Sequence, residues 1–196
     1  MRRITLSLAA LSLTFLAPLG GPAAAQNLYD PATRIAAQRE AMARLAFLDG
    51  VWRGPAWSLT PQGRREMIQA ERIGPMLGGA IRVMEGRGYA AADGSVAFNA
   101  FGVVSYDPVA RRYSLTSWAM GYSGTFPLTL TEDGYVWEAP AGPGAIMRYT
   151  ATVRDGAWHE IGERIARDAP PVRTVELNLR RVGDSAWPAG NPVPMR

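Results

Sequence analysis

His159 is the only histidine in the 196-residue chain, and an imidazole is the side chain best suited to acid–base chemistry or to metal or haem binding near neutral pH. It stands in an alternating run over residues 157–165, which predicts an inward face shared with Ile161 and Ile165. Such a histidine can act as a ligand, as a base or as a hydrogen-bonded core residue, and we favour the last. Because zinc normally takes several nitrogen or sulfur donors, one His and no Cys predict no metal site.

Four other charged residues are candidates for an internal site. Glu163 falls on the same predicted face as His159, whereas Glu71, Glu85 and Arg87 lie in runs whose inward phase the sequence does not fix. Two such groups inside the protein would have to pair, because an isolated buried charge is very costly. The favoured alternative places them at solvated strand ends. No spacing among them indicates a pair of catalytic carboxylates.

Serine and glycine patterns give no support to two common kinds of enzyme. No serine stands in the G-x-S-x-G context of a hydrolase nucleophile. The glycines of 78–79 and 86–88 do not form the strand-to-helix cradle that binds nucleotide phosphates, and we expect them to let strands bend. The sequence therefore leaves catalysis uncertain and favours a protein that is not an enzyme.

Aromatic residues are the strongest indication of a binding site. The chain has six Trp and seven Tyr, including Trp118, Trp137, Tyr149 and Trp158 in β-type segments. Rings with an apolar body and a polar edge suit a small apolar ligand, although the same rings and several methionines could instead fill the interior. We name Trp118, Tyr149 and His159 as the candidate ligand-binding residues.

Short β-type runs separated by turn residues dominate the chain from Val51 onward. Asp93-Gly94, Asp133-Gly134 and Asp155-Gly156 indicate tight hairpins, and Asp107-Pro108 indicates a further turn. Strands joined in this way are antiparallel neighbours. The predicted strands span residues 51–59, 65–73, 80–89, 95–106, 111–119, 124–131, 134–139, 145–154, 157–166 and 172–182.

The fold class is therefore mainly β, an antiparallel up-and-down barrel of about ten strands, because closure removes all sheet edges. A two-sheet sandwich is the alternative. One helix is expected over residues 30–48, with Asp30 as its N-cap and Pro31 in its first turn. We divide the chain into a helical segment at 26–50, the barrel at 51–183 and a flexible Pro-rich tail at 184–196.

Residues 1–25 have the pattern of a secretory signal peptide. Arg2 and Arg3 precede an apolar stretch at 4–19, and Ala23-Ala24-Ala25 forms a small-residue cleavage site. The expectation is an exported protein, in the bacterial periplasm, with no membrane span after cleavage. The net charge of +4 is spread along the chain rather than clustered, so no nucleic-acid partner is predicted. The expected oligomeric state is a monomer or a homodimer.

The segment Leu45 to Gly54, LAFLDGVWRG, resembles the G-x-W entry of the lipocalins and the wider calycin group. In that group the Trp closes one end of the barrel, and a basic residue of the last strand packs across its ring. The resemblance implies that Trp52 and Arg181 make this closure, since Arg181 is in phase with the apolar residues of the last strand, whereas Arg180 is not.

Further motifs are similar to those of the bacterial domain-of-unknown-function family 1579, a calycin-like family. They are IGPMLGG at 73–79, GVVSYDP at 102–108 followed by Arg112-Tyr113, and Trp118 in the next strand. The similarity extends over roughly residues 44 to 182, and it implies a barrel without implying an activity.

The nitrobindins are a neighbouring group of barrels that hold haem through a His on the last strand, whereas here the last strand has none and His159 precedes it. We therefore predict that the protein has no cofactor, and haem is the one cofactor that remains an alternative. The expected function is binding of a small hydrophobic or amphipathic molecule inside the barrel. The alternatives are a haem-binding or enzymatic barrel using His159, and a filled barrel that acts through its surface in an envelope assembly.

Overall fold

The computed structural model describes residues 30–188, and within this range the chain reverses repeatedly through tight turns. Asp155 and Gly156 adopt φ values of 52° and 68°, the left-handed pair that a primed hairpin turn requires. At the end of the fourth strand, Asp107 accepts hydrogen bonds from the backbone N–H groups of Val109 and Ala110 at 2.9 and 3.1 Å. These local devices set the strand ends and make each strand antiparallel to the next.

Ten strands result, and each overlaps the segment predicted for it. They are β1 (Gly50–Thr60), β2 (Gly63–Met76), β3 (Ile81–Ala90), β4 (Val96–Asp107), β5 (Arg112–Ala119), β6 (Tyr122–Leu130), β7 (Gly134–Pro140), β8 (Ala145–Arg154), β9 (Ala157–Ala166) and β10 (Ala169–Gly183).

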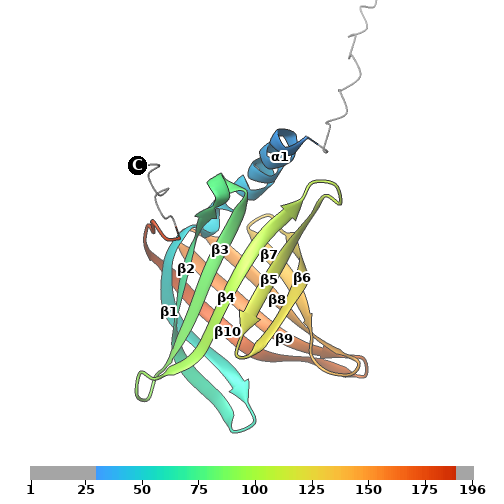
Figure 1. Ribbon diagram of the computed structural model, residues 1–196. Coiled ribbons are helices and arrows are strands. Elements are labelled where there is room, and N and C mark those ends of the chain that lie inside the picture. The colour runs from blue at the N-terminus through green and yellow to red at the C-terminus, as the bar shows by residue number, and fades with distance from the viewer. Residues whose placement is uncertain (1–29, 189–196) are drawn as a thin grey trace, which may run out of the picture.

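The strands form one closed barrel in which β1 pairs with both β2 and β10 (Figure 1). The first and last strands therefore meet, with Trp52 opposite Arg181 and Ala56 opposite Leu177. The predicted antiparallel barrel is confirmed, and the two-sheet sandwich is not observed.

A helix, α1 (Pro31–Ala43), and a short 3-10 turn, η1 (Ala46–Leu48), lie at one end of the barrel (Figure 1). The carboxylate of Asp30 caps the helix by accepting the Thr33 N–H at 2.8 Å, as predicted. Met42, Leu45 and Leu48 are buried at this end. We call it the closed end, and the other end, where the β1–β2 and β3–β4 hairpins turn, the hairpin end.

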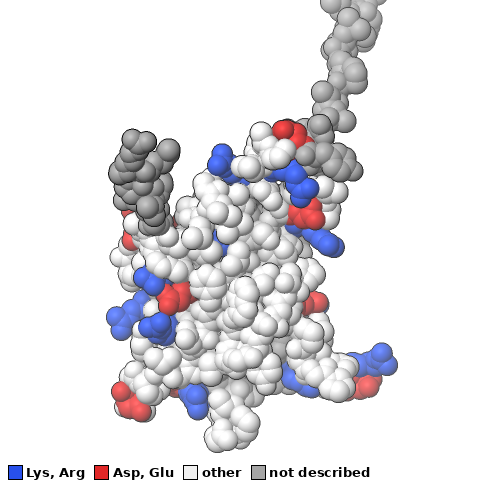
Figure 2. All heavy atoms as spheres, viewed as in Figure 1, with Lys and Arg blue, Asp and Glu red and all other residues white. Residues whose placement is uncertain are grey.

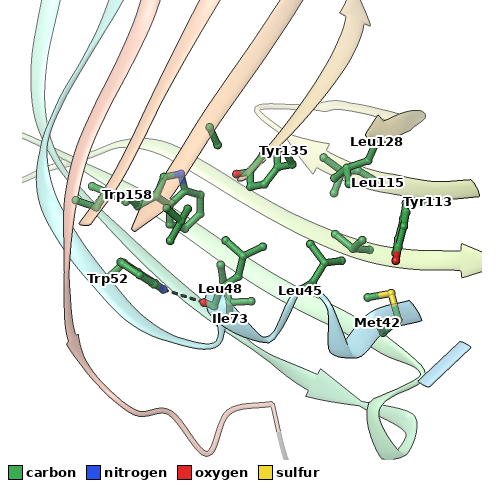
Figure 3. Close-up of a cluster of buried hydrophobic side chains, with 14 residues drawn as sticks. Met42, Leu45, Leu48, Trp52, Ile73, Tyr113, Leu115, Leu128, Tyr135 and Trp158 are labelled. Atoms are coloured by element: carbon green, nitrogen blue, oxygen red, sulfur yellow. Dashed lines mark hydrogen bonds between the residues drawn. The ribbon is translucent and has the colours of Figure 1, made fainter. Parts of the chain in front are cut away.

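Trp52 belongs to the buried cluster of the closed end, where it lies beside Trp158 and Leu48 (Figure 3). Its ring is 1% exposed, packs edge-on against Trp158 at 5.7 Å, and donates an Nε1–H hydrogen bond to the Leu48 carbonyl at 2.8 Å. The Arg181 guanidinium does not stack on this ring in the described structure. It instead donates to the Asp49 carbonyl at 3.1 and 3.3 Å. The predicted pair closes the barrel through strand pairing and this backbone contact, not through a cation–π interaction.

Replacing Trp52 with Phe should lower the free energy of unfolding by about 1–2 kcal/mol, because it leaves the buried Leu48 carbonyl without its donor while keeping most of the apolar volume. Urea denaturation followed by circular dichroism measures the change. Trp57→Phe is the matched control, since Trp57 donates to Glu176 from the outer face. A loss for Trp52→Phe no larger than for this control would show that the Leu48 bond is not stabilising.

Trp187, near the end of the described residues, packs against the outer face of the barrel. The Trp187 ring contacts Phe101 edge-on at 6.4 Å, and the Arg72 guanidinium lies 4.6 Å from its centre. The beginning of the segment predicted as a flexible tail therefore has packing contacts. Its remainder, 189–196, and the predicted leader at 1–25 lie outside the described residues.

Candidate functional site

The barrel encloses a cavity of about 410 Å³. Alternation along the strands decides its lining, because successive side chains point to opposite faces of the sheet. The lining is mostly apolar and aromatic, and includes Leu48, Met67, Met84, Phe98, Val104, Leu115, Leu128, Trp137, Tyr149, Trp158, Val175 and Leu177. The interior is therefore not filled by the protein's own side chains, which argues against the filled-barrel alternative.

An aromatic wall forms one side of the cavity. Trp137 of β7 and Tyr149 of β8 stack at 4.2 Å with an angle of 8° between their rings, and Phe126 lies 5.5 Å from Trp137. Gly162 of the neighbouring strand makes room for this stack, since a Cβ there would lie 2.9 Å from the Tyr149 ring. Flat rings held in this way present a rigid apolar surface.

Two carboxyl groups line the cavity toward the closed end. Glu71 of β2 and Glu160 of β9 are 9% and 8% exposed, and both line the cavity. Glu71 Oε1 accepts a hydrogen bond from Gln69 Nε2 at 2.6 Å. Glu160 Oε2 accepts from the Tyr135 hydroxyl at 2.6 Å and from Trp158 Nε1 at 3.2 Å. We call Gln69, Glu71, Tyr135 and Glu160 the acidic group.

Burial changes the chemistry of the acidic group. It raises the pKa of Glu71 to about 8, and the nearby Glu160 and Glu85 carboxylates add to the effect against the opposing Gln69 hydrogen bond. Burial also raises the pKa of Glu160, although hydrogen bonds from Tyr135 and Trp158 oppose the change. Glu71 can therefore hold a proton near neutral pH and release it when a positive charge enters.

Gly86 explains how the Glu71 carboxylate fits against the wall. A Cβ at this position would lie 2.6 and 2.9 Å from the two Glu71 carboxylate oxygens. The glycine on β3, directly opposite Glu71 in the strand pairing, thus leaves the space that the carboxylate occupies. Gly86 therefore has a packing role besides the strand bending predicted for it.

Of the three predicted binding residues, only Tyr149 lines the cavity. Trp118 lies on the outer face of β5, 48% exposed and 6.2 Å from Phe101. It belongs to an outer patch with Met120 and Tyr122, over a region of β4 and β5 where Figure 2 shows few charged side chains. The prediction that Trp118 lines the interior was wrong, because the register of β5 turns Leu115 and Ser117 inward instead.

His159 also points outward, so its predicted inward face was wrong. Trp158, Glu160 and Gly162 are the buried residues of β9, which leaves His159 on the outer face with Ile161. Its Nε2 lies 3.2 Å from Glu176 Oε1. Hydrogen bonds from Asn178 first and His159 second lower the pKa of Glu176 to about 2. The haem and enzyme alternatives both require His159 inside the barrel, and His159 lies on the outer face.

The remaining charged candidates divide in the same way. Glu71 points inward, whereas Glu163, Glu85 and Arg87 lie on the outer face, where Arg87 pairs with Glu85 at 3.0 Å. Sequence reasoning left the phase of Glu71 open and missed Glu160. The signal for Glu160 was its position between Trp158 and Gly162, but the two isoleucines of the opposite face obscured it.

Two further features of residues 30–188 bear on the chemistry. Within this range, no three His, Cys, Asp or Glu side chains are grouped so that they could hold a metal ion. None of the helices in the same range is both long enough and apolar enough to span a membrane.

The fold and the cavity define the class of protein: a closed ten-stranded antiparallel barrel with a mostly apolar interior and an internal acidic group. Among solved structures it is similar to the crystal structure of Rv2717c from M. tuberculosis, with a TM-score of 0.55 and 16% sequence identity over 72% of this chain and 96% of that one. At this identity the similarity shows a shared fold alone. No family model and no curated protein matches the sequence.

Proposed function

We propose that this protein is an exported barrel that binds a small hydrophobic or amphipathic molecule in its interior. The observation that carries the proposal is the cavity of about 410 Å³, which lies in the range of roughly 300–1,000 Å³ usual for small-molecule sites. Its apolar and aromatic walls favour an apolar ligand, and the acidic group supplies a few polar contacts at one end.

The mechanism is burial rather than reaction. Each 100 Å² of apolar ligand surface removed from water contributes about 2.5 kcal/mol, before the cost of immobilising the ligand. The rigid Trp137–Tyr149 stack keeps part of that cost low, because the wall is already ordered. The leader pattern at 1–25 supports export, and the G-x-W and Tyr-Asp-Pro motifs support membership of the calycin-like group.

Filling the cavity should abolish binding. Ser117 of β5 lines the cavity opposite two glycines, Gly102 and Gly124, so a tryptophan at position 117 would occupy the ligand space. We expect Ser117→Trp to weaken binding of the neutral fluorescent probe N-phenyl-1-naphthylamine at least tenfold, measured by titration of its fluorescence.

The matched control is Thr116→Trp, one residue away on the outer face, where Thr116 hydrogen-bonds Thr125 at 2.9 Å. This variant should keep the wild-type affinity. A probe that fails to bind the wild type, or that binds Ser117→Trp and Thr116→Trp equally well, would contradict the proposal.

A further inference from the structure

The acidic group has no positive partner in the described structure. The ion pairs within residues 30–188 join other residues, and neither Glu71 nor Glu160 takes part in one. Arg65 is the one arginine in the cavity lining. It lies six residues from Glu71 along β2, so their Cα atoms are roughly 20 Å apart. The arginine is at the hairpin end and cannot neutralise the carboxyls.

Each carboxyl also keeps one oxygen free for a ligand. The hydrogen bonds from Gln69, Tyr135 and Trp158 all reach Glu71 Oε1 or Glu160 Oε2. Glu71 Oε2 and Glu160 Oε1 accept none from residues 30–188. No fully enclosed polar side-chain atom in that range lacks a hydrogen bond, so these two oxygens keep some accessible surface, and both residues line the cavity.

The hydrogen bonding and charge of the acidic group determine which chemical class of ligand it favours. An ionised carboxylate only accepts hydrogen bonds, so a ligand group that donates them and carries a positive charge favours the ionised form of both carboxyls and displaces the Glu71 proton. A ligand carboxylate or phosphate would add a negative charge to a space that already holds two acidic side chains, which electrostatic repulsion opposes. An ammonium offers three donors and a positive charge, and a charged pair of this kind is the usual state of a buried carboxylate.

We infer that the natural ligand is an amphipathic amine, with its ammonium between Glu71 and Glu160 and its hydrocarbon part along the Trp137–Tyr149 wall toward the hairpin end. This inference rests on the proposed function and adds the ligand class. The cavity runs from the acidic group past the aromatic wall to Thr60 and Arg65 beside the β1–β2 hairpin, so one end suits a cation and the rest suits an alkyl or aryl chain.

A series of ligands that differ only in the head group tests the inference. Decylamine, decanol and decanoate compete with N-phenyl-1-naphthylamine for the full-length protein at pH 7. We expect decylamine to bind at least tenfold more tightly than decanol, and decanoate to bind most weakly. In the double variant Glu71→Gln/Glu160→Gln the preference for decylamine should fall to less than threefold, while decanol affinity stays within about twofold. Glu132→Gln, in the exposed β6–β7 turn, is the control.

A second measurement needs no variant. Burial and the neighbouring Glu160 and Glu85 carboxylates keep Glu71 protonated near neutral pH. Tyr135 and Tyr149 are the other titratable groups near Glu160. A bound ammonium should therefore expel the Glu71 proton. Calorimetry at pH 7 in buffers of different ionisation enthalpy should therefore show release of close to one proton per decylamine bound, and none for decanol.

The outcomes separate the two proposals. If neither the probe nor any of the three decyl compounds binds, the proposed function fails. If the probe and decanol bind, but decylamine binds no more tightly than decanol or releases no proton, the function stands and the amine inference is overturned. A preference for decylamine that persists in the double variant would also overturn it.

Discussion

Glu71→Gln should remove most of the pH dependence of stability between pH 5 and pH 8.5. The pKa of Glu71 rises from its usual 4.5 to about 8 on folding, so the folded protein holds a proton over this range that the unfolded chain has released. The Glu71 contribution to stability is therefore fully present below about pH 4.5 and is lost as the pH rises toward 8. The full shift corresponds to a loss of about 5 kcal/mol.

The glutamine variant cannot ionise at position 71 and keeps the oxygen that accepts from Gln69. We expect it to be less pH-dependent than the wild type and more stable at pH 8.5 by several kcal/mol. Glu160 is still present and its pKa is also raised, so a decrease in the same direction should remain. Urea denaturation at several pH values gives the free energies.

The pH range of this experiment isolates the acidic group. The lowered pKa of Glu176 acts in the opposite direction, since that stabilisation is lost only as the pH falls from 4.5 toward 2. Glu132→Gln on the surface should leave the wild-type profile unchanged. A wild-type stability that is constant or rises between pH 5 and 8.5 would show that Glu71 is not protonated in the folded protein.

Arg82→Ala should be the most destabilising substitution at the closed end, by about 3–5 kcal/mol. The side chain of Arg82 on β3 is 6% exposed and binds both carboxylate oxygens of Asp49, at 2.8 and 3.0 Å, as well as the Met42 carbonyl at the end of α1. Removing it leaves the Asp49 carboxylate and the Met42 carbonyl without their donor. The helical segment would then lose its polar attachment to the barrel.

The control for this prediction lies on the same strand. Arg87 pairs with Glu85 at 3.0 Å but is 43% exposed, so Arg87→Ala should cost at most about 1 kcal/mol. Asp49→Ala and the double variant Asp49→Ala/Arg82→Ala complete a thermodynamic cycle, with an expected coupling on the order of 2 kcal/mol. A coupling near zero, or equal losses for Arg82→Ala and Arg87→Ala, would show that the attachment contributes little.

The predictions for the candidate site were less accurate than those for the strands. On β9, two isoleucines made the odd-numbered face look like the core, and a single glutamate made the other face look solvated. The structure reverses this assignment, since Trp158 and Gly162 are buried and carry Glu160 inward with them. A period-two pattern tells which residues share a face but not which face is inside when both carry apolar residues.

The acidic group could not be predicted from the sequence, because its two glutamates are far apart along the chain. Glu71 and Glu160 are 89 positions apart on β2 and β9, and they share the cavity only because the barrel closes between β1 and β10. The packing role of Gly86 could not be predicted either, because the need for a glycine arises only when the Glu71 carboxylate lies against it in the folded barrel. No local sequence pattern indicates which distant residues will share the cavity.

Turn residues, alternation and the helix cap by themselves determined the ten strands, the N-terminal helix and the antiparallel order, because these depend on interactions between neighbours in the chain. The tertiary structure alone decided that the interior is open, that His159 and Trp118 lie outside it, and that the carboxyls of Glu71 and Glu160 line the same cavity. Those features depend on the phase and closure of the whole sheet, to which every strand contributes and which no single segment encodes.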